Sequence, residues 1–181
     1  MRAGAVSVNL EAEVVPMKLE SLHDLYLSEL RDLYSAEDQI VKALPKMIEK
    51  AESTNLRNAL KSHLEETRGH VARLEQVFDM HGEAAKKEKC KGMQGILEEG
   101  DDMVGKEATA AVRDAAIISA CQRVEHYEMA AYGTVRTYAE QMGHERAAAV
   151  LQQTLNEETA ADEKLTQIAR SRVNIQATRT A

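Results

Sequence analysis

The chain has 181 residues, a formal net charge of −7 at pH 7 and only 3% aromatic residues, and its length suits one domain. The acidic charge disfavours binding to nucleic acid, whose backbone is also negative. Membrane insertion is disfavoured too, because no apolar run reaches the roughly 20 residues of a membrane-spanning helix.

The first 18 residues are predicted to form a flexible leader. They contain Glu11 and Glu13 and lack the long apolar segment of a secretory signal. The two cysteines, Cys90 and Cys121, are not spaced as a metal-binding pair. We therefore expect a cytoplasmic protein.

Four long helices are predicted from apolar residues that recur every three or four positions, in a chain rich in good helix formers. They span about 21–51, 56–81, 109–142 and 145–169. Short turns make the first and last pairs antiparallel hairpins. The long connection over 83–108 contains a short amphipathic helix at 93–104 and lets the second and third helices run parallel. The sequence thus predicts an all-α, ferritin-like four-helix bundle over 19–169. From Arg170 onward we expect a frayed tail.

Polar residues interrupt the apolar stripe of every long helix near its middle. Steps of three or four from apolar neighbours direct these side chains inward, where the helix mid-points meet at one level. The candidates are Glu37 in the first helix, His63, Glu66 and the additional candidate His70 in the second, Glu125 and Glu128 in the third, and Glu158 and Asp162 in the fourth.

Carboxylates packed together in a bundle interior cannot all ionise unless positive charge compensates them. Two metal ions would supply that charge, and carboxylate oxygens with one or two imidazoles suit iron or manganese. Such a two-metal site can bind dioxygen or peroxide. Tyr34, one turn before Glu37, and His126, beside Glu125, are predicted to contact the ligands from outside.

A metal-free alternative is also compatible with the sequence. An inward glutamate is often paired with arginine or lysine, so these carboxylates could form a structural network in a non-catalytic, dimeric stress or scaffold protein. The coincidence across four helices favours the metal site. DNA protection is a third possibility, which the acidic charge disfavours.

Several runs of residues in these helices resemble the YciE/YciF family of ferritin-like proteins, over about 21–169. They are Leu33-Tyr34-Ser35-Ala36-Glu37, His63-Leu64-Glu65-Glu66-Thr67, Val124-Glu125-His126-Tyr127-Glu128 and Glu157-Glu158 followed by Asp162. The resemblance implies a bundle related to rubrerythrins and ferritins, commonly a homodimer, in bacterial stress responses. It implies no defined reaction, substrate or redox partner, so enzymatic activity stays an open question.

The sequence departs from the Glu-x-x-His pattern that two-iron bundles carry on two helices. Gly69 and Ala161 occupy the positions where those histidines would lie. The nearest substitutes are His63 or His70 on the second helix and Asp162 on the fourth. This departure predicts a site that is richer in carboxylates than other two-iron sites, that binds metal more weakly, or that is empty in the purified protein.

Overall fold

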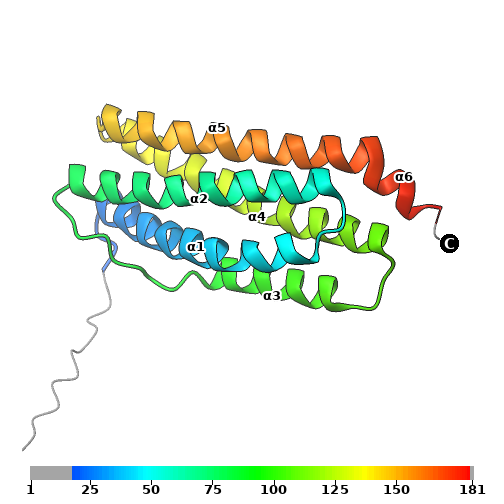
Figure 1. Cartoon of the computed structure of the whole chain (residues 1–181). Coiled ribbons are helices and arrows are strands. Elements are labelled where there is room, and N and C mark those ends of the chain that lie inside the picture. The colour runs from blue at the N-terminus through cyan, green and yellow to red at the C-terminus, as the bar shows by residue number, and fades with distance from the viewer. Residues whose placement is uncertain (1–17, 180–181) are drawn as a thin grey trace, which may run out of the picture.

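The computed structural model describes residues 18–179, and every regular element in that range is a helix (Figure 1). The predicted leader lies outside the described residues except for Lys18. The helices are α1 (Leu22–Lys50), α2 (Thr54–Met80), α3 (Lys91–Gly105), α4 (Ala110–Gln141), α5 (Glu145–Ile168), a π-helical turn (Ala169–Val173) and α6 (Asn174–Ala177). The predicted all-α class is confirmed.

The ends of the long helices follow from ordinary capping chemistry. The Ser21 hydroxyl accepts a hydrogen bond from the Asp24 backbone N–H, at 3.1 Å, and so begins α1. Gly82 and Gly143 adopt positive φ angles of 67° and 76° just after α2 and α4, a conformation that costs glycine little. The bounds of the four long helices accordingly lie close to those predicted from the sequence.

Two antiparallel hairpins, α1–α2 and α4–α5, pack together as a four-helix bundle. Helix α1 packs against α2 and α4, and α5 packs against the same two helices, so these contacts form the four sides of the bundle. The segment after α2 runs along the outside of the bundle to α3, which lies against α1 and α4 (Figure 1). This crossover makes α2 and α4 parallel, as expected from its length.

The crossover is anchored to the bundle at Cys90, which is fully buried. Its backbone N–H donates to the Ser35 hydroxyl at 3.1 Å, and its carbonyl accepts from the Gln39 amide at 3.1 Å. Its sulfur accepts from the Met93 N–H at 3.3 Å and caps α3. Cys90 therefore has a structural role in positioning α3.

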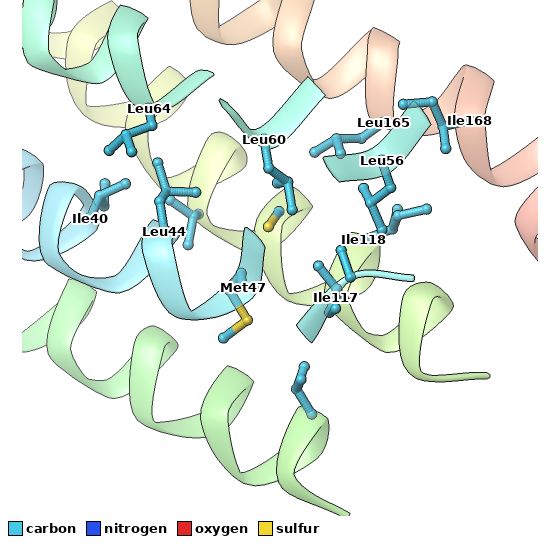
Figure 2. Close-up of a cluster of buried hydrophobic side chains, with 14 of the residues drawn as sticks. Ile40, Leu44, Met47, Leu56, Leu60, Leu64, Ile117, Ile118, Leu165 and Ile168 are labelled. Carbon is cyan, nitrogen blue, oxygen red and sulfur yellow. The ribbon is translucent and has the colours of Figure 1, made fainter. Parts of the chain in front are cut away.

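Two apolar clusters fill the bundle on either side of a polar layer. The α3-side cluster, shown in Figure 2, includes Ile40, Leu44, Met47, Leu56, Leu60, Leu64, Ile117, Ile118, Leu165 and Ile168. The aromatic cluster, toward the other end, includes Tyr26, Leu30, Tyr34, Leu74, Phe78, Tyr132, Val135 and Leu151. Each long helix contributes to both clusters, so the residues between them on each helix are brought to a common level.

The structure differs from the prediction of a frayed tail after Arg170. The chain stays helical through Ala177, and Val173 is only 1% exposed in the α3-side cluster. The cause is that Val173 lies one turn after Ala169 and continues the apolar stripe of α5. Among the described residues, no helix is both long and apolar enough to cross a membrane.

Candidate metal centre

Six ionisable side chains from all four long helices meet in the polar layer between the two apolar clusters. Five of them are at most 1% exposed, and His63 is 6% exposed. The six are Glu37 from α1, His63 and His70 from α2, Glu125 and Glu128 from α4, and Glu158 from α5. This convergence was expected from the positions of these residues on the apolar stripes.

These side chains form two overlapping groups in which one potential ligand atom per residue lies within 4.8 Å of the others. The first group is His63, Glu125, Glu128 and Glu158, and the second is Glu37, His70 and Glu158. Glu158 belongs to both. A carboxylate has two oxygens, so Glu158 is placed to serve two neighbouring cation positions at once.

Two nitrogen–oxygen pairs within the layer are as close as hydrogen-bonded atoms. His70 Nδ1 lies 2.7 Å from Glu158 Oε1, and His63 Nε2 lies 3.2 Å from Glu125 Oε1. Nevertheless His70 Nδ1, His63 Nε2 and both oxygens of Glu158 lack a hydrogen bond of acceptable geometry. These contacts are therefore close ion-pair contacts that lack hydrogen-bond geometry.

Several carboxylate oxygens in the layer are buried and accept no hydrogen bond. Within the described protein no group donates a hydrogen bond to Glu37 Oε2, to Glu125 Oε2, or to either oxygen of Glu128 or Glu158. Tyr132 supplies one exception, since its hydroxyl donates to Glu37 Oε1. Buried polar atoms normally have partners because leaving them unpaired costs about 1–3 kcal/mol each. The unpaired oxygens are available to cations.

The pKa values of the carboxyl groups reflect this burial. Burial raises the pKa of Glu128 well above its usual range, and the charges of Glu158 and Glu37 raise it further. Burial also raises the pKa of Glu37 and raises that of Glu125 to about 8. Burial acts in the same direction on Glu158, but the adjacent His70 outweighs it and lowers the Glu158 pKa.

The two histidines are drawn toward their charged form by the same carboxylates. Burial lowers the pKa of His70, but its contacts with Glu158 and Glu37 outweigh that effect and raise the pKa to about 10. Burial likewise opposes charge on His63, and Glu125 raises its pKa well above the ordinary value. Two imidazolium groups still cannot neutralise four carboxylates, so the fully ionised layer keeps excess negative charge.

A hydrogen-bonded pair outside the layer holds His70 in place. Glu157 Oε2 lies 3.0 Å from His70 Nε2, and Glu157 Oε1 accepts from Arg73 at 2.8 Å. When Nε2 carries the proton and donates to Glu157, the lone pair of Nδ1 faces Glu37 and Glu158. The sequence carries one signal for this role of Glu157, its adjacency to Glu158, and the role was not predicted.

Tyr132 also contacts the layer, whereas its sequence position favoured a role in core packing over a hydrogen bond to a ligand. It is fully buried, and its hydroxyl reaches Glu37 on the opposite hairpin. The available signal was its position one turn after Glu128 on the same face of α4.

Glu66 and Asp162, two predicted ligands, lie outside both groups. Glu66 is 44% exposed, because its position on α2 lies about 100° around the helix from the inward Thr67. Its carboxylate lies 3.8 Å from His63 Nδ1 and accepts a hydrogen bond from the Ser62 hydroxyl at 3.3 Å. Asp162 lies one turn beyond Glu158 and accepts a hydrogen bond from Gln122 at 2.9 Å. Both therefore lie at the edge of the layer.

Tyr34 and His126, predicted to contact the ligands from outside, lie away from the two groups. The Tyr34 hydroxyl donates to Glu75 at 2.6 Å, and this contact raises the Tyr34 pKa to about 12. His126 is 67% exposed, and its Nε2 lies 3.4 Å from Asp162. The supporting positions predicted for these residues are occupied instead by Tyr132 and Glu157.

A cavity of about 300 Å³ between α2 and α5 connects the layer with the surface. His63 and Glu125 line its buried part, and Glu66 and Lys164 line its exposed part. The remaining wall is mostly apolar: Ala59, Leu60, Ala160, Ala161 and Leu165. The cavity therefore gives a small molecule access to His63 and Glu125 in the first group.

Comparison with known proteins relates nearly the whole bundle to one family. The model of the family described as a domain of unknown function, DUF892, matches residues 21–178. Protein YciF of Escherichia coli K12 is 42% identical over 159 residues, which cover 87% of this chain and 96% of that protein.

Solved structures show the same architecture. The E. coli stress protein YciF aligns with a TM-score of 0.83 and 42% identity, over 86% of this chain and 99% of that chain. YcfI of Rhodopseudomonas palustris, for which a structural role has been suggested, aligns with a TM-score of 0.81 and 44% identity, over 84% and 96%. A Xanthomonas campestris protein, XCC3681, is 16% identical with a TM-score of 0.70 over 88% and 99%, and supports the fold alone.

Proposed function

This chain belongs to the DUF892 family, and we propose that its polar layer binds two metal ions, iron or manganese, in a protein that handles oxygen or peroxide during stress. The stress context rests on the similarity to the E. coli stress protein YciF. The metal assignment rests on one observation: buried carboxylate oxygens from four helices converge without hydrogen-bond donors.

The donor atoms fit the proposed ions. Each of the two groups offers one imidazole and at least two carboxylates, and Glu158 is common to both. Iron and manganese accept this mixture of oxygen and nitrogen donors. Two cations would also supply the charge that two histidines cannot.

The protein's own residues prepare the site for small molecules. Bound metal ions would supply Lewis acidity and redox chemistry. Glu157 fixes the ring of His70, and Tyr132 holds the carboxylate of Glu37 by a hydrogen bond. The apolar wall of the cavity beside His63 limits access by bulk water and suits dioxygen or peroxide better than a large charged substrate.

A second function is a non-catalytic structural protein, acting as a homodimer, in which the layer stays free of metal. The role suggested for YcfI favours it, as do the contacts of His63 with Glu125 and of His70 with Glu158. Glu128 opposes it, because both of its oxygens are buried and unpaired.

Elemental analysis of protein produced in medium rich in iron and manganese would separate the two functions. We expect close to two metal ions per chain, with anomalous scattering beside Glu158. Glu128→Gln and Glu158→Gln should each lose at least half of the metal. Glu66→Gln and Asp162→Asn remove the same charge outside the groups and should retain it.

Wild-type protein that is isolated free of metal, and whose melting temperature does not change when Fe²⁺ or Mn²⁺ is added, would reject the metal centre. The structural function would then stand.

A further inference from the structure

Three histidines from three separate elements gather at the end of the bundle nearest the aromatic cluster. His23 lies in the first turn of α1, His81 follows α2, and His144 precedes α5. The His81 and His144 ring centres are 4.6 Å apart, and those rings lie 6.0 and 6.3 Å from His23. The three ring planes are mutually inclined by 63–71°. This histidine cluster is built by tertiary structure, since its members are far apart in the sequence.

Most nitrogen atoms of these rings take no part in the proposed metal centre or in helix capping. His81 Nε2 lies 3.1 Å from the Tyr26 hydroxyl. The rings of His23 and His144 make no hydrogen bond or ion pair with the described part of the chain, and His144 gives no side-chain cap to α5. Several ring nitrogens are therefore free to bind a ligand.

We propose that the histidine cluster binds one late first-row divalent ion, with Zn²⁺ as the reference ligand, through His23, His81 and His144. Imidazole is a preferred ligand of zinc, copper and nickel. Three histidines with a fourth position open to water form a known type of zinc site.

The spacing of the rings supports this assignment. With zinc–nitrogen bonds of about 2.0–2.1 Å and tetrahedral angles, the centres of three bound rings lie roughly 5 Å apart. The observed separations of 4.6, 6.0 and 6.3 Å bracket that value. To bind one ion, the three rings must rotate and His23 must move slightly inward. His23 is exposed, so its side chain can adopt other rotamers.

The local electrostatics also favour metal binding. Burial lowers the pKa of His81, and the neighbouring His144 and His23 lower it further. The neutral imidazole is the form that binds metal. The lowered pKa of His81 therefore favours the form that binds metal.

The site is independent of the proposed metal centre. His23 and Glu37 are both on α1, about 20 Å apart along the helix axis. The histidine cluster also offers only nitrogen donors, whereas the polar layer is rich in carboxylates. Zinc here would connect the start of α1, the end of α2 and the turn before α5, and should stabilise this end of the bundle.

Calorimetric titration of the Glu128→Gln protein with Zn²⁺ tests the histidine cluster while metal binding by the polar layer is weakened. We expect one Zn²⁺ equivalent per chain to remain. His23→Ala and His144→Ala should each lower its affinity at least tenfold and abolish the zinc-dependent rise in melting temperature. His126→Ala removes an exposed histidine elsewhere on the bundle and should change the affinity less than twofold.

Two results would overturn the proposal. One is that the Glu128→Gln protein binds no zinc, while the wild-type and His144→Ala proteins bind equal numbers of zinc ions per chain. The other is an affinity that His23→Ala and His144→Ala leave unchanged. Both variants alter rings without hydrogen bonds in the described structure, so they should fold even if His81→Ala, which removes the Tyr26 contact, does not.

Discussion

The α3-side cluster and the polar layer are adjacent in the bundle but use burial in opposite ways. Leu60 and His63 lie one turn apart on α2, and both are buried. Burying a leucine side chain contributes about 1.5–3 kcal/mol to folding. Burying Glu128, whose oxygens lack donors, opposes folding unless a cation or a proton neutralises it. The cluster therefore stabilises the fold, whereas burial of Glu128 without the metal ions that we propose opposes it.

The largest effect is expected from Leu60→Ala in the α3-side cluster. Leu60 is 1% exposed, so the substitution should lower the free energy of unfolding by about 2–5 kcal/mol. Urea denaturation should show this loss with and without added metal. Leu19→Ala, at a side chain that is 57% exposed, is the control and should have almost no effect. A loss that appears only with metal would contradict the distinction between the two regions.

The opposite sign is expected from Glu128→Met in the polar layer. An apolar side chain of similar volume removes a buried, unpaired carboxyl, so the metal-free protein should gain about 1–4 kcal/mol. The same variant should lose the stabilisation that Mn²⁺ gives to wild-type protein. Urea denaturation in chelator and in Mn²⁺ measures both quantities. Destabilisation of the metal-free protein would show that the layer is itself a stabilising network.

The pH dependence should distinguish metal-free from metal-loaded protein. The raised pKa of Glu125 makes its burial increasingly unfavourable as pH rises from 4.5 to about 8. His70 stabilises the fold fully below pH 6.5, and this contribution is lost as pH rises toward about 10. The lowered pKa of Glu158 acts in the other direction, and its contribution is lost only as pH falls below 4.5.

Metal-free stability should thus fall between pH 6.5 and 9, by up to about 1.4 kcal/mol per pH unit for each proton involved. Metal affinity should rise over the same range, because ligands bind in their deprotonated form. Urea midpoints in chelator and in Mn²⁺ should therefore diverge with rising pH. Parallel curves would argue against metal binding by these groups.

The smallest effect is expected from Tyr132→Phe, which keeps the ring and removes the hydrogen bond to Glu37. Metal-free stability should fall by about 1 kcal/mol, because a buried carboxylate loses its donor. Tyr34→Phe is the matched control: its hydroxyl bonds Glu75 away from the layer, so metal affinity should not change. Equal metal affinities in wild type and Tyr132→Phe would show that Tyr132 does not position Glu37.

Much of the fold and part of the candidate site could be predicted from local sequence patterns. Steps of three and four placed Glu37, His70 and Glu158 on inward faces, and the long connection after α2 predicted the crossover. The same periodicity wrongly predicted that residues at the edge of an apolar stripe belong to the two groups. Asp162 lies on nearly the same face of α5 as Glu158, but its carboxylate accepts a hydrogen bond from Gln122 on α4 and does not join either group.

The sequence by itself determined the helices, their hairpins and the depth at which charged residues interrupt the apolar stripes, because helical period and loop length are local properties of the chain. Only the tertiary structure decided which of those residues meet. It placed Glu158 between two groups, brought Tyr132 to Glu37 and Glu157 to His70, and gathered His23, His81 and His144 at one end. The physical reason is that such contacts depend on how helices distant in sequence pack and rotate against each other, which no single helix specifies.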